Sequence, residues 1–270
     1  MALVGHDRGY PPLLGYPHAS EAPWRPLLDR IPRARLVAFG EVHETPWAVG
    51  LARDLLARAC QGGLGWAGFE YFNTSQQGLL DSWASGRVGW RGLVEEYTRG
   101  PEGFNLEVYR PLLEAARACG ARLVALMPPR PQANLVARQG RLPERAPGGV
   151  EADPDAWPGY RGELEPLFPR EGPMARIPVE RLLLAQSFKD SVAASRVAWA
   201  LSRWGRGFIV MGWAHVELPG AVVDRALASL GLRGGDAVIV SARRGAPSRV
   251  AAALRGRRRS PSLAGVAVGP

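Results

Sequence analysis

The sequence predicts an α/β protein with a parallel-rich central sheet flanked by helices, together with a helical or irregular insertion. Several short apolar runs do not alternate with polar residues, which is typical of strands covered on both faces. Longer stretches with helical periodicity separate these runs, as in consecutive βαβ units. With 270 residues and a hydrophobic content of 46%, the chain can bury a core of that size.

The predicted strands and helices alternate through most of the chain. Strands are expected at 35–40, 66–70, 121–127, 208–213 and 237–241. Helices are expected at 46–60, 74–84, 106–119, 179–204 and 219–230. The first helix has clear boundaries, because Thr45 before Pro46 is a typical start and the Gly62–Gly63 pair is a typical stop.

Composition divides the chain into a main domain and three segments of different character. Residues 1–34 are rich in proline and aromatic residues and are expected to wrap over the surface of the α/β domain, which spans 35–242. Within that domain, prolines break every period across 140–178. This insertion is either a lid over the crevice or a solvated connector. Residues 243–270 are expected to form an Arg-rich flexible tail.

The net charge of +9 is concentrated near the C-terminus, where seven arginines follow Asp236 and no acidic residue does. Only one of the 34 basic residues, Lys189, is a lysine, so arginine is the default cation of this sequence. An Arg-rich tail is therefore a weak argument for phosphate binding. We do not expect nucleic acid as a partner.

The two cysteines, Cys60 and Cys119, lie late in predicted helices and lack the spacing of a zinc site. We expect them to fill small core positions in a reduced, cytoplasmic protein, with one disulfide as the alternative. The N-terminus does not have the pattern of an export signal, and no run approaches the roughly 18 apolar residues of a membrane helix. No membrane association is expected.

Four ionisable residues follow predicted strands directly: Glu41, His43, Glu70 and His215. The carboxyl ends of parallel strands face one crevice, so these side chains are expected to meet there. A carboxylate beside an imidazole can orient it and raise its basicity, and the same pair can ligate a metal. The alternatives are histidines bonded to the backbone and a salt bridge from Glu70 to an arginine.

Four further residues could support such a site. Arg130 ends the third strand within a Pro-Pro-Arg-Pro turn, where it would bind an oxyanion or remain a surface residue. Tyr71 could donate a hydrogen bond, ligate iron or pack in the core. Gln186 and Asp190 share one face of a long helix and either support the site or form an ordinary polar surface.

Several common motifs are missing from the sequence. No glycine-rich dinucleotide or phosphate-binding loop follows a predicted strand. No Gly-x-Ser-x-Gly elbow is present. Nucleotide binding and serine hydrolysis are therefore not expected.

The remaining motifs, in their order along the chain, resemble the ChaN-like haem-binding uptake proteins. Their superfamily includes the Tiki proteases, the TraB-type proteins and the erythromycin esterases. The motifs are Gly40-Glu41-Val42-His43-Glu44, Gly68-Phe69-Glu70-Tyr71-Phe72, Tyr109-Arg110-Pro111-Leu112-Leu113-Glu114, Pro128-Pro129-Arg130, Gln186-Ser187-Phe188-Lys189-Asp190 and Gly212-Trp213-Ala214-His215.

The resemblance implies an α/β fold with a helical subdomain and a site built from Glu41, His43, Glu70 and His215. Matching positions serve as base and orienting groups in the esterases and as metal ligands in the protease branch. The ChaN branch consists of haem-binding lipoproteins, and this chain differs from it because no lipid anchor or export signal is found.

Our leading hypothesis is a hydrolase that acts on an ester or amide of a small-molecule or peptide substrate. His43 would be the general base, oriented by Glu41. Glu70 and His215 would position water or hold a divalent ion such as Mn²⁺, Co²⁺ or Zn²⁺. Arg130 would stabilise the oxyanion.

The alternative is a haem- or iron-binding protein with an axial ligand from Tyr71, His43 or His215. Whether the chain forms a homodimer is left open by either hypothesis.

Overall fold

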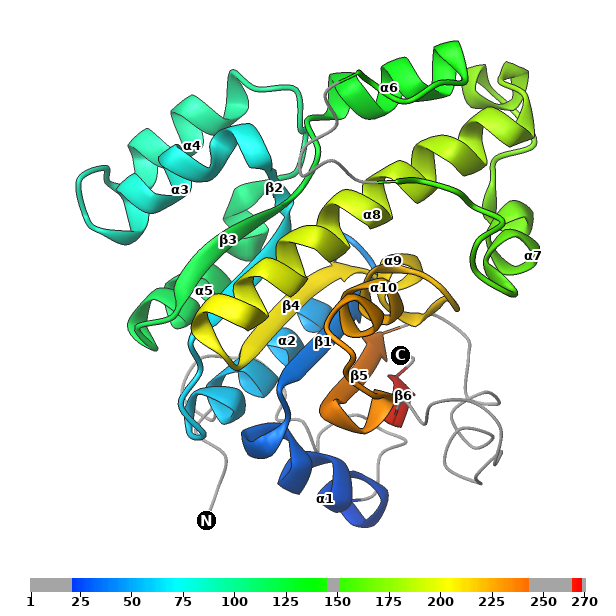
Figure 1. Ribbon diagram of the computed structural model, residues 1–270. Coiled ribbons are helices and arrows are strands. Elements are labelled where there is room, and N and C mark those ends of the chain that lie inside the picture. Colours follow the sequence, from blue (N-terminus) through cyan, green and yellow to red (C-terminus); the bar gives the residue numbers. More distant parts are fainter. Residues whose placement is uncertain (1–20, 145–150, 243–263, 269–270) are drawn as a thin grey trace.

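The computed structural model describes residues 21–144, 151–242 and 264–268, and it confirms the predicted α/β architecture (Figure 1). Six strands form one sheet in the order β3-β2-β4-β1-β5-β6, and each neighbouring pair is parallel. They are β1 (Leu36–Glu41), β2 (Trp66–Asn73), β3 (Arg122–Met127), β4 (Gly207–Gly212), β5 (Ala237–Ala242) and β6 (Ala264–Val268). The first five lie where strands were predicted.

Helices cover both faces of the sheet. They are α1 (Glu21–Arg30), α2 (Pro46–Cys60), α3 (Gln77–Ala84), α4 (Trp90–Thr98), α5 (Leu106–Ala118), α6 (Arg130–Gln139), α7 (Tyr160–Leu164), α8 (Val179–Trp204), α9 (Trp213–Glu217) and α10 (Val222–Ser229). In β1, Val37 and Phe39 pack toward α2 and α5, whereas Leu36 and Ala38 pack toward α8 and α10. Both faces are therefore buried, which explains the unbroken apolar strand runs.

The order of the strands opens a crevice at their carboxyl ends. Strand β4 lies between β1 and β2, although the chain passes through β1, β2 and β3 before reaching it. The α2 connection from β1 to β2 packs on one face, and the α8 connection from β3 to β4 packs on the other. Helices that leave a sheet toward opposite faces separate at its edge, and ligands bind at such a point.

A lobe formed by α6, α7 and the first half of α8 extends beyond this end of the sheet (Figure 1). Its core includes Val136 of α6 and Phe188 of α8, with Phe168 and Ile177 of the proline-rich insertion packed against it. Helix α6 was not predicted, because Pro129-Arg130-Pro131 was interpreted as a rigid turn. Proline is compatible with the first turn of a helix, and α6 begins there.

Other local features differ from expectation. Thr45 precedes α2 but its side chain does not cap the helix; its hydroxyl donates to the His43 carbonyl oxygen instead. Residues 264–268, within the predicted tail, form β6 beside β5, because this apolar run lacks arginine. Residues 21–33 form α1 and a short 3-10 helix, while 1–20 and the remainder of the tail lie outside the described residues.

The cysteines are not separate core residues, as we had expected, but form a disulfide. Cys60 ends α2, Cys119 follows α5, and their Cα atoms are 6.0 Å apart because the two helices pack together on one face of the sheet. Disulfides are more typical of oxidising compartments, so the bond does not support a reduced cytoplasmic location, which stays a prediction. Within the described ranges, no helix is long and apolar enough to span a membrane.

Reduction of this disulfide is expected to destabilise the fold. The bond closes a loop of 59 residues, and loss of that constraint should lower the free energy of unfolding by about 2–5 kcal/mol. The measurement is thermal unfolding with and without dithiothreitol, with the Cys60→Ser/Cys119→Ser variant as the control that no longer responds to reductant. Equal midpoints for the wild type in both conditions would contradict the prediction.

Candidate functional site

Four side chains meet at the floor of the crevice, but Glu70, which was expected at a strand end, lies within β2, which continues to Asn73. Glu41 ends β1, His43 lies two residues beyond it, Glu70 belongs to β2, and His215 lies in α9 directly after β4. Glu70 Oε1 is 3.5 Å from His215 Nε2 and 3.7 Å from His43 Nε2. The structure thus brings together residues that are up to 174 positions apart in the sequence.

Each imidazole is held from behind by a carboxylate. His43 Nδ1 lies 2.9 Å from Glu41 Oε1, and His215 Nδ1 makes a short hydrogen bond with Asp190 Oδ1. Both carboxylates are almost fully buried. A proton on each Nδ1 satisfies these bonds and leaves both Nε2 atoms directed toward Glu70.

Two tyrosines in turn hold these carboxylates. Tyr109 Oη donates to Glu41 Oε1 at 2.9 Å, and Tyr160 Oη donates to Asp190 Oδ2 at 2.6 Å. Tyr160 belongs to α7, inside the proline-rich insertion. The insertion therefore contributes directly to the arrangement of the site.

Gly212 brings β4 close to both neighbouring side chains. Its backbone N–H donates a short hydrogen bond to Glu70 Oε2. A Cβ atom at this position would lie 2.9 Å from His43 Nε2 and 3.4 Å from Glu70 Oε2. Any larger residue would displace the imidazole, so the approach of the three strands depends on glycine here.

The backbone after His43 adopts an unusual conformation. Glu44 has φ 55°, the only positive value for a non-glycine residue in the described part of the chain. Two hydrogen bonds hold it there: its N–H donates to Tyr109 Oη at 2.7 Å, and its Oε1 accepts from the Asn105 N–H at 2.8 Å. This turn fixes the direction in which His43 leaves β1.

Burial and charge set the protonation of the floor. Burial raises the pKa of Glu41. Burial would also raise the pKa of Glu70, but the charges of His215 and His43 and the Gly212 N–H together lower it. For His43, burial lowers the pKa, and the Glu41 hydrogen bond and the Glu70 charge outweigh this, raising it to about 9. At neutral pH Glu70 is therefore ionised and His43 carries a proton.

The other residues identified from the sequence occupy different places. Arg130 begins α6 and lines the crevice, while its backbone N–H donates to Glu102 Oε1 at 3.1 Å. Tyr71 is fully buried, stacks on Tyr109 with ring centroids 3.6 Å apart and does not line the crevice. Gln186 lies beside His215, its amide nitrogen 3.2 Å from both ring nitrogens.

Sequence reasoning missed three residues of the site. Tyr160 gave no signal because the insertion has no period. Tyr109 appeared only within a motif, without a role. Lys189 stood out as the one lysine of the chain, and the structure places it on α8 facing the crevice.

The crevice above the floor has a volume of about 470 Å³. Its walls come from the end of β3, from α6, from α8 and from the insertion, whose Phe168 and Met174 line it. No serine, threonine or cysteine is among the described residues that line it. The arrangement can therefore activate water or bind a ligand, but it offers no side-chain nucleophile of the usual kinds.

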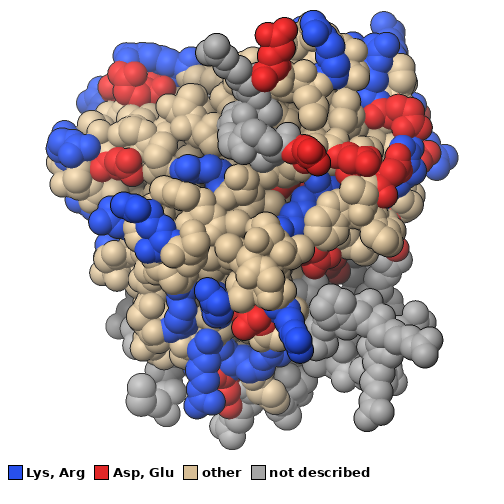
Figure 2. Space-filling model, viewed as in Figure 1, with Lys and Arg blue, Asp and Glu red and all other residues tan. Residues whose placement is uncertain are grey.

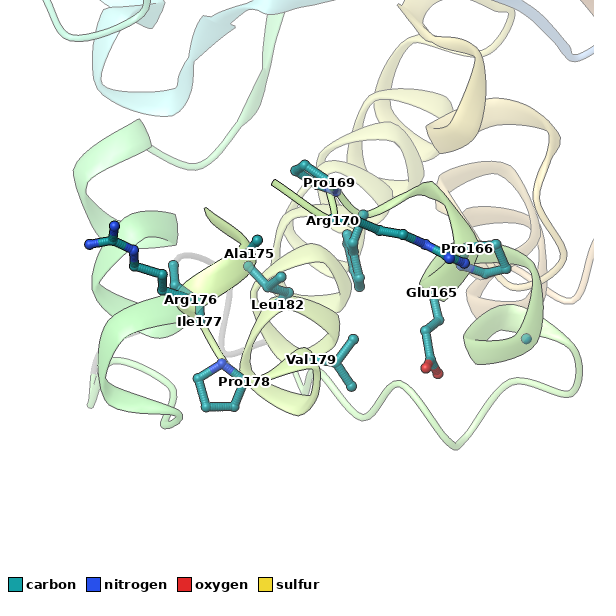
Figure 3. Close-up of a pocket in the computed structure, with 12 residues that line it drawn as sticks. Glu165, Pro166, Pro169, Arg170, Ala175, Arg176, Ile177, Pro178, Val179 and Leu182 are labelled. Atoms are coloured by element: carbon teal, nitrogen blue, oxygen red, sulfur yellow. The ribbon is translucent and has the colours of Figure 1, made fainter. Parts of the chain in front are cut away.

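A second pocket of about 600 Å³ lies within the insertion, at the start of α8. Figure 3 shows the side chain of Arg176 directed away from those of Glu165 and Arg170. None of the imidazoles or buried carboxylates described above lines it. The crevice is therefore the better candidate site.

The fit to a metal is incomplete. Two imidazole nitrogens and one carboxylate oxygen face one another, but among the described residues no group of three or more His, Cys, Asp or Glu side chains is arranged to hold a metal ion. The fit to haem is better at His43, because its side chain is 40% exposed and lines the crevice. Buried Tyr71 does not fit the role of axial ligand.

Comparison with known proteins agrees with this fold. The family model described as haem-binding uptake, Tiki superfamily, ChaN matches residues 27–226, well over half of the chain. Among solved structures, one describing cofacial haem binding to ChaN of Campylobacter jejuni matches with a TM-score of 0.59 and 12% identity, covering 82% of this chain and 86% of that one.

A Bacillus cereus protein matches with a TM-score of 0.48 and 12% identity, covering 84% of this chain and 70% of that one. No curated protein matches the chain.

The protonation of His43 can be tested by NMR titration. We expect its pKa to be about 9 in the wild type and to fall by roughly one unit or more, toward 6.5, in Glu41→Gln. Because folding raises this pKa, the stabilisation is complete below about pH 6.5 and is lost as the pH rises through 9.

Glu44→Gln is the matched control, since its carboxylate bonds Asn105 and not the imidazole. His43 should be assigned with a His43→Gln variant. A wild-type pKa near 6.5 for His43 would contradict the proposed charge state.

Proposed function

The chain belongs to the haem-binding uptake, Tiki superfamily, ChaN family, and from this premise we propose that it hydrolyses an ester or amide bond with an activated water. One observation carries the proposal: Glu70 lies between the Nε2 atoms of His43 and His215 at the floor of an open crevice. The opposite charge states of His43 and Glu70 provide an acid and an anion at one point.

In the proposed reaction His215 is neutral, and protonated His43 and the Gly212 N–H favour the ionised form of Glu70. A water molecule then donates one hydrogen bond to Glu70 Oε1 and the other to His215 Nε2. As the water oxygen attacks the carbonyl carbon, His215 takes its proton and buried Asp190 stabilises the imidazolium that forms. These roles differ from our first hypothesis, in which His43 was the base.

Protonated His43 faces the same point and would stabilise the developing oxyanion. It then gives its proton to the leaving alcohol or amine as the carbonyl–heteroatom bond breaks. Glu70 Oε1, near both rings, returns the proton from His215 to His43 and restores the site. The net reaction consumes one water and releases an acid together with an alcohol or amine.

Glu70, His43 and His215 could also hold a divalent ion that activates the water. Arg130 would then bind the substrate and stabilise its oxyanion. The steps above do not depend on a metal. The experiment below tests whether Mn²⁺, Co²⁺ or Zn²⁺ changes the activity.

Hydrolysis should be measured on generic ester and peptide substrates, after chelation and after adding each of the three ions. We expect His215→Ala and Glu70→Gln to lower kcat by about 10²–10⁴-fold, the usual loss for a positioned acid or base. Tyr160→Phe removes one hydroxyl behind Asp190 and should have a smaller effect.

Arg176→Gln, in the neighbouring pocket, is the control and should retain wild-type activity. Absence of turnover in every condition would refute the proposed hydrolase.

Haem binding is a second candidate function, favoured by His43, which opens toward a crevice with apolar walls. Iron bound there would add a redox-active centre, and His43 would hold it through Nε2 after losing its proton. Titration with hemin should shift the Soret band in the wild type and in Tyr71→Phe, but not in His43→Ala. A shift that survives in His43→Ala would contradict this ligand.

A further inference from the structure

The charges in the crevice that lack a partner are positive. Three carboxylates line it, and each is already bonded. Glu70 accepts from Gly212, Glu44 accepts from the Asn105 N–H, and Glu102 accepts from Asn73 at 2.7 Å and from the Arg130 N–H. Hydrogen-bond donors of the protein therefore compensate part of their negative charge.

The cationic side chains of Lys189 and Arg130 differ from these carboxylates in their contacts. Both line the crevice, and neither side chain has a hydrogen bond or ion pair with any residue that the structure describes. Some other cations of the chain are paired, such as Arg91 with Glu95 and Arg161 with Glu180. Figure 2 shows positive and negative side chains interspersed on one face of the molecule.

Lys189 is also distinguished chemically. It is the only lysine among 34 basic residues, it is half-buried, and it lies beside Asp190 on α8. Its charge is near enough to the floor to lower the pKa of Glu70 and to oppose protonation of His43. A compact ammonium fits there as a point charge with rotatable donors, which a planar guanidinium does not reproduce.

The rest of the wall is apolar. It includes Phe104, Met127, Met174 and Leu182, from four different segments. A hollow with apolar walls and a few convergent polar groups is the usual form of a small-ligand site. The crevice thus combines an apolar wall with two cations that have no bonded partner among the described residues.

We propose that the crevice selects ligands in which an apolar body carries a carboxylate, with Lys189 and Arg130 binding the carboxylate and the apolar wall holding the body. This assignment rests on the proposed function for placing the reacting bond above Glu70. In this proposal the apolar body is an acyl chain.

The test compares octanoate with octanamide by isothermal titration calorimetry on the full chain. We expect octanoate to bind roughly tenfold or more tightly than octanamide, as for a hydrogen bond to a charged group. Lys189→Met and Arg130→Gln should each reduce this preference. Lys189→Arg should keep part of it, and high salt should weaken it.

Arg176→Gln is the matched control for a ligand in the neighbouring pocket. Equal binding of octanoate and octanamide, or a preference removed by Arg176→Gln but not by Lys189→Met, would overturn the proposal. Failure of hydrolysis with the preference intact would count against the proposed function only.

Discussion

The organisation of this molecule depends on one buried carboxylate. Glu70 is 7% exposed and lies inside a sheet whose neighbouring residues are apolar. An ionised carboxylate in such a place is costly unless it is paired and hydrogen-bonded. The Gly212 N–H and the two imidazoles meet that requirement, so the charge is tolerated only because β1, β2 and β4 bring these groups together.

The same requirement spreads outward through both imidazoles. Each ring must be turned so that Nε2 faces Glu70, and a buried carboxylate at Nδ1 achieves this for each. Those carboxylates in turn need donors, which Tyr109 and Tyr160 supply. The chain of bonds therefore reaches from α5 on one face to α7 in the insertion. This makes the insertion part of the site and more than a connector.

Two backbone features make the arrangement possible. Gly212 leaves space for His43 that any side chain would fill, and Glu44 takes a left-handed conformation to turn the chain after it. Both lie within a few residues of the floor. Above the floor, the cationic groups of Lys189 and Arg130 line the crevice without a bonded partner among the described residues.

The sequence alone determined the architecture and the convergence of Glu41, His43, Glu70 and His215, although Glu70 lies within β2 and not at its end. Period and composition are local properties, and parallel strands place their carboxyl ends together whatever the details of packing. The long helix α8 was predicted at its observed bounds for this reason. Only the tertiary structure decided the disulfide, the place of Tyr160 behind Asp190 and the carboxylate that each imidazole contacts. Pairing across 59 residues, burial and charge depend on which surfaces meet in space, and no local pattern encodes that.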